Sequence, residues 1–310
     1  MHIGGYGQIP LKQFDYVSPN SAIKLQSARS CLYLFLKSTS ASVIYLPNYI
    51  CDSILPALED LNIVIRRYNI DDFLLPTSLP DLANNEYFLI VNYFGLLTDQ
   101  IDLLQVNKKQ VIIDNSQAFF SNTFGFAASI YSLRKFFPVP DGGYLISDIE
   151  HPHQLDQYNG EEHLKHIVLR GAGLVEEGYF HFLEAEIALS DFKPKLMSKI
   201  SEALMKTIDI ENVKLSRRNN FLLLHEHLKS INQFDLPLGE NDVPLCYPLL
   251  LNFEVSKLHK KLVDEKIFTP RYWPNIPENY FYENALFIPL DERIGQEEID
   301  FIVAVLQKNI

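Results

Sequence analysis

The amino-acid sequence predicts an α/β protein in which a mostly parallel sheet lies between helices. Three observations predict this fold. The 310-residue chain is 47% apolar, which is enough for a large core. Its first half repeats short runs rich in β-branched and aromatic residues. Segments with helical periodicity separate several of these runs, and a strand–helix–strand repeat favours parallel strands covered on both faces.

The elements follow in order along the chain. We expect strands at 42–47, 63–69, 86–94, 110–115 and 128–133, and helices at 27–37 and 51–61. After residue 150 the pattern changes to helices at 178–192 and 194–229, the second of them broken or bent. The apolar run 246–253 and the helical segments 255–267 and 296–308 indicate a smaller α+β unit. We therefore predict a large domain over residues 1–205 and a small C-terminal domain over residues 206–310.

Charge and composition argue against several classes of protein. The formal net charge of -12 disfavours nucleic acid as a partner, and no polybasic cluster indicates a membrane surface. The longest apolar run, 87–97, is about half of what a bilayer requires, and the first ten residues do not read as a secretory signal. Cys31, Cys51 and Cys246 lack C-x-x-C spacing, which favours a reducing compartment. We expect a soluble, acidic, cytoplasmic protein.

Three stretches at predicted strand ends or helix starts can carry chemistry. In 26–32, Ser27 can cap a helix, and the small residues Ser27 and Ala28 leave backbone N–H groups open, so the turn is either a simple cap or a phosphate seat. In 111–119, Asp114 ends a buried strand, where a carboxylate either meets a cation or caps the next turn. Gln117 follows one turn later and can point the same way.

The third stretch, 132–145, places Ser132 and Lys135 after a strand and before the glycine pair 142–143. A lysine at the mouth of a buried sheet loses solvation, which lowers its pKa and makes the amine nucleophilic. The alternative is a lysine that reaches solvent. Together, the three stretches supply what pyridoxal phosphate (PLP) needs, namely an amine, an acid for the pyridine nitrogen and a phosphate nest.

With these residues the chain resembles the DegT/DnrJ/EryC1/StrS family of PLP-dependent sugar aminotransferases, as a short and divergent member. The stretch 26–32 is similar to the phosphate turn of the family, and 111–119 is similar to its E-D-x-A-Q segment. The stretch 135–143 is similar to its lysine segment, and 91–95 to V-H-x-x-G with Asn92 in place of histidine. Residues 3–7, 216–221 and 286–306 are similar to further family segments. The resemblance implies the fold-type-I fold of aspartate aminotransferase.

The resemblance also implies roles for individual residues. Lys135 forms the Schiff base and moves the proton, Asp114 keeps the pyridine nitrogen protonated, and Gln117 lies near the phenolic oxygen of the ring. The remaining cofactor-binding candidates are the phosphate-turn and ring-contacting residues Ser27, Ala28, Arg29, Ser132, Tyr49 and Asn92. The implied reaction moves an amino group from a donor, glutamate, to a keto acceptor that is a nucleotide-linked sugar. The implied assembly is a homodimer with the active site at the interface.

Some positions depart from the family pattern. Ile130 occupies the place of a phosphate-binding serine, Cys51 that of an aromatic residue that stacks on the ring, and Pro194 that of an asparagine from the neighbouring subunit. These departures leave two alternatives, a catalytically retired protein with a binding or assembly role and a PLP-dependent sugar dehydratase.

Four histidines and Arg271 each allow more than one interpretation. The histidines at 151, 153, 163 and 166 match no standard zinc spacing, so we expect no metal. Arg271 precedes an aromatic turn and can grip a substrate carboxylate, or it can stack on Tyr272 or Trp273 at the surface.

Overall fold

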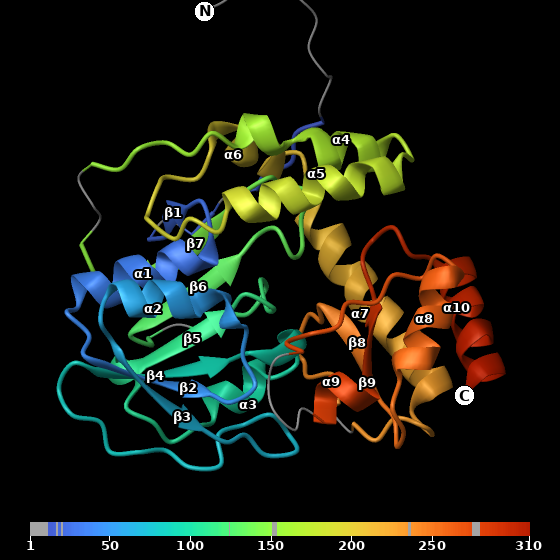
Figure 1. The fold of residues 1–310 in the computed structure, drawn as a ribbon, viewed down its shortest axis with the longest axis horizontal. Coiled ribbons are helices and arrows are strands. Elements are labelled where there is room, and N and C mark those ends of the chain that lie inside the picture. The colour runs from blue at the N-terminus through green and yellow to red at the C-terminus, as the bar shows by residue number, and fades with distance from the viewer. Residues whose placement is uncertain are drawn as a thin grey trace, which may run out of the picture.

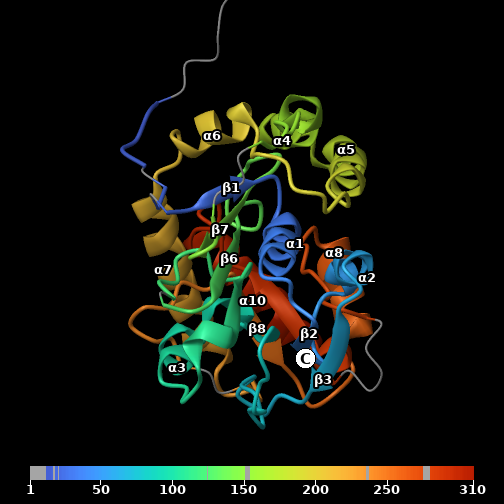
Figure 2. The same ribbon diagram turned by 90° about the vertical axis from the view of Figure 1, so that its left-hand side faces the viewer.

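The computed structural model shows a mixed α/β molecule whose main sheet lies between helices (Figure 1). Figure 2 shows α1 and α2 on one side of this sheet and α3 on the other. The structure describes residues 12–16, 18–19, 21–123, 125–150, 154–234, 237–274 and 280–310. The family-like residues 3–7 and the histidines at 151 and 153 lie outside the described residues.

Strands and helices occupy the following ranges. The strands are β1 (Ile23–Leu25), β2 (Val43–Pro47), β3 (Val64–Tyr68), β4 (Glu86–Val91), β5 (Val111–Asn115), β6 (Ala128–Ser132), β7 (Gly143–Ser147), β8 (Cys246–Leu250) and β9 (Ala285–Pro289). The helices are α1 (Ala28–Ser38), α2 (Leu55–Asp60), α3 (Thr98–Asp102), α4 (Lys165–Gly171), α5 (Val175–Ala188), α6 (Lys199–Met205), α7 (Ile210–Leu228), α8 (Ser256–Asp264), α9 (Tyr280–Asn284) and α10 (Gln296–Asn309).

The described residues form a seven-stranded sheet in the order β1-β7-β6-β5-β4-β2-β3. The strands β3, β2, β4, β5 and β6 pair in parallel, whereas β7 runs antiparallel to both β6 and β1. The buried apolar strands β2 and β5 are the ones that the sequence shows as continuous hydrophobic runs. Because parallel strands end at one edge, the last residues of β2, β4, β5 and β6 share that edge.

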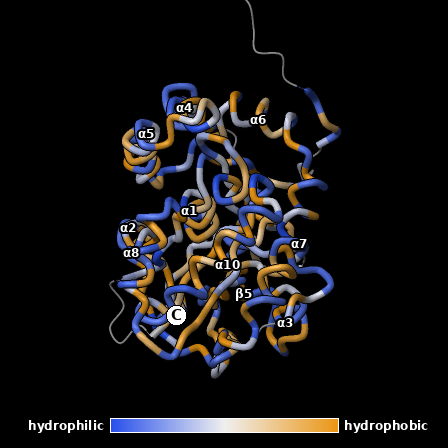
Figure 3. The backbone as a smooth tube through the Cα atoms, turned by 90° about the vertical axis from the view of Figure 1, so that its right-hand side faces the viewer, coloured by the Kyte–Doolittle hydropathy of each residue, from blue (hydrophilic) through white to orange (hydrophobic). Residues whose placement is uncertain are grey.

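A second sheet pairs β8 with β9 in antiparallel fashion, next to α7, α8 and α10. The largest apolar cluster contains buried residues of both sheets, such as Ile112 of β5 and Leu249 of β8. Figure 3 shows the hydrophobic segments that run through the middle of the molecule. The two parts of the chain therefore share one continuous core, and the domain boundary near residue 205 stays a prediction.

The helical stretch predicted at 194–229 divides into α6 and α7. Its first residues, 194–198, form no helix, and Ser198 and Asp209 cap the two helices through hydrogen bonds to the backbone N–H groups of Ser201 and Asn212. Periodicity could not separate the two helices because their apolar positions continue across the break. Within the described residues, no helix combines the length and the apolar character needed to cross a membrane.

Asp141 fastens α6 to the loop between β6 and β7. This carboxylate is fully buried and accepts hydrogen bonds from the backbone N–H of Ser198 at 2.8 Å and from the hydroxyls of Ser198 and Ser201. Burial raises the pKa of Asp141, and the hydrogen bonds from the two serines oppose that rise. The loop that bears Lys135 is thus held to the start of α6.

We expect Asp141→Ala to lower the free energy of unfolding by about 3 kcal/mol, because it leaves several buried donors without their acceptor. Denaturant titration measures the change. Asp209→Ala is the matched control, since this exposed cap of α7 makes a single backbone hydrogen bond of 3.1 Å and its loss costs about 1 kcal/mol. Equal losses of unfolding free energy for the two variants would contradict the role of Asp141 as a clamp between the loop and α6.

Candidate functional site

The candidate site lies where β4, β5 and β6 end and α1 begins. The register pairs Val91 of β4 with Asp114 of β5, and Asp114 with Ile130 of β6. Residues paired in neighbouring strands direct their side chains to the same face of a sheet. Asp114 and Ile130 therefore share a face, and Ser132 shares it because it lies two residues after Ile130.

The first turn of α1 can serve as an anion seat on this face. Ser27 caps the helix by accepting a hydrogen bond of 3.1 Å from the N–H of Ser30. The N–H groups of Ala28 and Arg29 donate to no described residue. The side chain of Arg29 turns away and donates to the carbonyl of Leu189 at 3.0 Å, just beyond α5. The backbone N–H groups of two successive residues thus remain open at a helix N-terminus.

Gly143 lets the antiparallel strand β7 approach this turn. A Cβ built on Gly143 lies 2.4 Å from the carbonyl carbon of Ser27 and 2.6 Å from the nitrogen of Ala28, both backbone atoms. Ser132 pairs directly with Gly143, so its side chain is directed to the face on which α1 starts. The Ser132 hydroxyl makes no hydrogen bond to a described residue and is partly exposed. Ser132 can therefore supply the hydroxyl that the buried Ile130 cannot.

Asp114 is partly exposed at the end of β5. One carboxylate oxygen accepts a hydrogen bond of 2.8 Å from the N–H of Ser116, and the other makes none with a described residue. Burial raises the pKa of the Tyr93 phenol, and the charges of Tyr68, Tyr49 and Asp114 add to that rise. Asp114 thus caps the next turn, as one alternative predicted, and keeps one oxygen free for a further donor.

The Gln117 side chain supplies a buried donor without a partner. Its oxygen accepts a hydrogen bond of 3.0 Å from the N–H of Phe94, whereas its nitrogen Nε2 is buried and donates to no described residue. An unsatisfied buried donor costs about 1–3 kcal/mol. This unpaired amide donor and the close backbone contact at Gly143 fit a planar cofactor that carries a phosphate group.

Lys135 lies in the turn that follows β6, between the buried residues Leu133 and Phe136. Its side chain is exposed, so this chain alone does not provide the desolvation that we expected for it. Burial raises the pKa of the Cys246 thiol, and the positive charges of Arg217 and Lys135 oppose that rise. The ring centroid of the next residue, Phe136, lies 4.8 Å from the guanidinium of Arg217 in α7, so the loop faces the C-terminal part of the chain.

The structure gives Asn92 another surrounding than the one predicted. Its Nδ2 donates to Thr98, Asn115 and Ser121 at 3.1–3.2 Å, and its Oδ1 accepts from the N–H of Leu97 at 3.1 Å. Asn115 follows Asp114 directly and so lies on the opposite face of the sheet. The Asn92 amide is thus satisfied by groups inside the protein, and its contact with the cofactor stays a prediction.

Tyr49, the next candidate, is buried near the same edge. Its ring stacks on Tyr93 at 5.6 Å and meets the edge of Trp273 at 4.4 Å, and its hydroxyl is buried without a described partner. Cys51 is partly exposed and makes a hydrogen bond of 3.1 Å to the hydroxyl of Ser53.

Arg271 is engaged within the C-terminal part. Its guanidinium lies 4.2 Å from the ring centroid of Tyr282 and donates to the carbonyl of the same residue. The stacking alternative is thus found, but on Tyr282 rather than on Tyr272 or Trp273. Among the described residues, no cluster of metal ligands is present.

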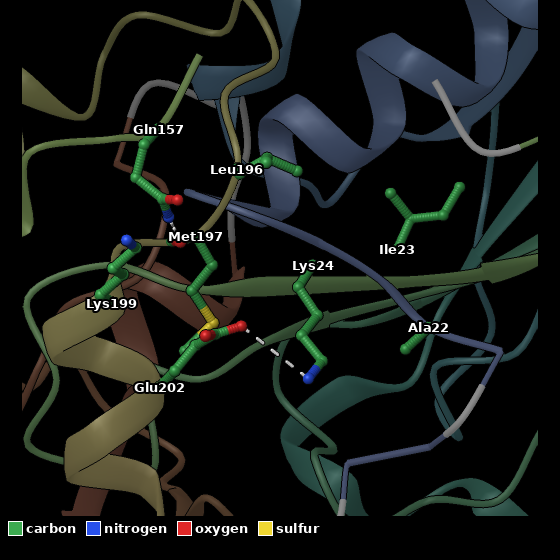
Figure 4. Close-up of a pocket in the computed structure, with 8 residues that line it drawn as sticks. All are labelled: Ala22, Ile23, Lys24, Gln157, Leu196, Met197, Lys199 and Glu202. Atoms are coloured by element: carbon green, nitrogen blue, oxygen red, sulfur yellow. Dashed lines mark hydrogen bonds and ion pairs between the residues drawn. The ribbon is translucent and has the colours of Figure 1, made fainter. Parts of the chain in front are cut away.

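A cavity of about 240 Å³ lies away from these residues, against β1 and the start of α6. Figure 4 shows Lys24 and Glu202 facing each other across it, 3.9 Å apart. Because none of the candidate residues lines this cavity, we do not assign it to the site.

Two residues near Lys135 were not predicted as site residues, namely Arg217 and Cys246. The sequence showed Arg217 only as part of a basic helix stretch, 216–221. Nothing in a sequence tells that an arginine in a polar helix is buried, because burial depends on which elements pack against it.

No family model matches the chain, and no curated relative matches it. Solved structures do match. A sugar aminotransferase from Micromonospora echinospora is 12% identical, with a TM-score of 0.65 over 94% of this chain and 88% of that one. A DegT DnrJ EryC1 StrS aminotransferase from Brucella abortus is 14% identical, with a TM-score of 0.65 over 93% and 85%. An E. coli GDP-4-keto-6-deoxy-D-mannose-3-dehydratase with bound hydrated PLP is 14% identical, with a TM-score of 0.65 over 92% and 87%. The chain therefore has the fold-type-I fold that the sequence predicted.

We expect Gly143→Ala to weaken the binding of pyridoxal phosphate at least tenfold and to cost about 1–3 kcal/mol of stability, because the new methyl group displaces the first turn of α1. Equilibrium dialysis and thermal melting measure the two effects. Gly171→Ala is the control, since a Cβ there meets nothing within 4 Å. Unchanged binding of pyridoxal phosphate by Gly143→Ala would show that the first turn of α1 does not belong to the site.

Proposed function

We propose that this chain is a PLP-dependent aminotransferase that uses Lys135 to bind the cofactor and to move the proton. One observation carries the proposal. The open first turn of α1, Ser132 and Asp114 belong to one face of one sheet edge, beside the loop that bears Lys135. Each is the residue type that the cofactor requires at that place. The solved structures with this fold support the proposal, since one of them is named with bound PLP.

Each residue has a definite task in this proposal. The N–H groups of Ala28 and Arg29 and the hydroxyls of Ser27 and Ser132 would hold the phosphate. The free oxygen of Asp114 would hold the proton on the ring nitrogen, and Nε2 of Gln117 would donate to the phenolic oxygen. The cofactor supplies an electron sink when bound. Lys135 would move a proton from the α-carbon of the donor to the cofactor and, after the keto product has left, from the cofactor to the acceptor carbon.

We propose glutamate as the amino donor and a nucleotide-linked keto sugar as the acceptor. The sequence resemblance supports glutamate. The sugar is supported by two structural neighbours, one named as a sugar aminotransferase and one named for a GDP-linked keto sugar. A cytoplasmic location follows from the same sequence features as before and stays a prediction.

A second candidate function is a binding or assembly role without catalysis. The exposure of Lys135 and the apolar Ile130 in the place of a serine favour it. The dehydratase neighbour supports a third candidate, a sugar dehydratase. The aminotransferase and the dehydratase both convert a bound substrate, whereas a protein with a binding or assembly role does not.

We also propose a homodimer. Several large apolar side chains of α5 are exposed, among them Tyr179 at 61%, Phe180 at 63% and Ile187 at 73%. Figure 3 shows hydrophobic stretches on the α4–α5 pair at one end of the molecule. The C-terminal end of α5 lies close to the candidate site, because Arg134, next to Lys135, forms an ion pair with Glu186. A second copy that covers α5 would bury this surface and enclose the exposed lysine.

Borohydride reduction after incubation with pyridoxal phosphate is expected to fix the cofactor on Lys135, because this lysine follows β6 at the sheet edge that bears Asp114 and Ser132. Peptide mass spectrometry locates the modified lysine. Lys135→Arg should lose the label, whereas Lys109→Arg, at the other end of β5, should keep it. A label spread over surface lysines with no excess at Lys135 would sink the proposal.

The loaded protein then distinguishes the candidates. An aminotransferase releases 2-oxoglutarate from glutamate in a single turnover without acceptor. A loaded protein that releases none with any amino acid supports the binding role instead.

We expect Ile187→Glu and Phe180→Glu to shift the chain from dimer to monomer at micromolar concentration, because each places a charge in an apolar contact. Light scattering after size-exclusion chromatography measures the mass. Leu103→Glu is the control, since Leu103 is 78% exposed but lies next to α3. A wild-type chain that is monomeric at these concentrations would contradict the homodimer.

A further inference from the structure

A buried arginine of α7 lies against the loop that bears Lys135. Arg217 is 3% exposed, and its guanidinium lies 4.8 Å from the ring centroid of Phe136, the residue after Lys135. Burial lowers the pKa of Arg217, and the more distant charges of Asp291 and Glu292 oppose that fall. Keeping the Arg217 guanidinium charged inside the protein therefore costs free energy.

Only one edge of this guanidinium is used. Nη1 donates to the carbonyls of Leu245 at 3.0 Å and Pro244 at 3.4 Å. Nε is buried and has no partner among the described residues, and both hydrogen bonds of the side chain to described residues come from Nη1 rather than Nη2. The Nε–Nη2 edge, which binds a planar oxyanion side-on with two parallel hydrogen bonds, is thus left open.

No carboxylate of the described chain neutralises this charge by direct contact. Asp291, the first acid that acts on it, is held by Arg293 through bonds of 2.6 and 2.9 Å. The two carbonyls accept hydrogen bonds but carry no net charge. A buried cation without a bonded anion is costly, so an external anion would bind here favourably.

The contact with Phe136 relates this open edge to Lys135. Phe136 directly follows Lys135, and its ring centroid lies 4.8 Å from the Arg217 guanidinium. An anion on Arg217 would therefore lie close to the loop that bears the amine. Arg271, the arginine expected to bind a carboxylate, is instead bound to Tyr282.

We propose that Arg217 binds the carboxylate of the amino donor through its Nε–Nη2 edge. This proposal rests on the proposed aminotransferase function and adds the residue that orients the donor. A carboxylate matches a single guanidinium edge in shape and in charge. The oxyanion of a substrate can also be a phosphate of the acceptor, and the two sources are separated by titrating both.

The test measures equilibrium binding on the full chain loaded with pyridoxal phosphate. In this state 2-oxoglutarate binds without reacting, because the cofactor carries no amino group to give. Isothermal titration calorimetry with 2-oxoglutarate and, separately, with inorganic phosphate compares the wild type with Arg217→Lys and Arg217→Gln. Arg218→Gln is the matched control on the same helix, since Arg218 binds the carbonyls of Gly239 and Asp242.

We expect 2-oxoglutarate to bind about 10–100-fold more weakly to both Arg217 variants, with phosphate binding and the Arg218 variant unchanged. Arg217→Lys keeps the charge but not the fork, so it separates geometry from charge. Because Arg217 is buried, thermal melting and cofactor uptake are measured on each variant. Guanidinium ion added to Arg217→Ala should restore 2-oxoglutarate binding, which a purely structural loss would not allow.

Three results would overturn the proposal. One is unchanged 2-oxoglutarate binding in folded Arg217 variants. Another is a loss in Arg271→Gln instead, and the third is a loss of phosphate binding alone. A chain that takes up no cofactor sinks the proposed function, yet the same titration on that chain still reports whether Arg217 binds a carboxylate.

Discussion

A backbone-to-backbone contact without room for a side chain organises this molecule. Gly143 at the start of β7 touches the turn that opens α1, and this contact fixes a strand that runs antiparallel to both of its neighbours against a helix N-terminus. Because Ser132 pairs with Gly143, the same contact sets how far Ser132 lies from the open N–H groups. The loop between β6 and β7 is thereby given a defined start and end, and Asp141 ties its second half to α6. The position of Lys135 therefore follows from contacts that involve other residues.

The two faces of the main sheet carry polar groups in different states: on one face they bond to one another, and on the other some have no partner. On the face opposite Asp114, a buried network links Asn92, Asn115, Thr123 and Ser129 through side-chain hydrogen bonds of 2.6–3.2 Å. Polar groups in such a network are satisfied by one another and hold the strand ends rigid. On the face of Asp114, the oxygen, hydroxyl and amide groups keep unused bonding capacity. An edge with both properties can hold a ligand without rearrangement of its strands.

The sequence predicted the central strands because their runs are buried on both faces, and β2, β4, β5 and β6 lie where the runs are. It missed β1, which has three residues, β7, which directly follows the glycine pair, and β9, whose short apolar run has no periodicity to identify it. Asp114 was predicted at the end of a buried strand, where β5 places it, while its role toward the cofactor and that of Gln117 stay predictions. The buried hydrogen bonds of Asn92 could not be predicted, because the face of a residue just beyond a strand depends on its tertiary contacts. Arg217 and the exposure of Lys135 could not be predicted, since both depend on how distant elements pack.

The exposed position of Lys135 has a consequence for how the loop that bears it is held in place. The strands, the first turn of α1 and the clamp at Asp141 are complete in the polypeptide itself, and none of their described contacts needs a guest molecule. A small aldehyde can meet the lysine from solvent once the chain has folded. The contacts that frame the loop and the chemistry of its lysine are therefore separable, so a change of the Lys135 side chain leaves the scaffold around it intact.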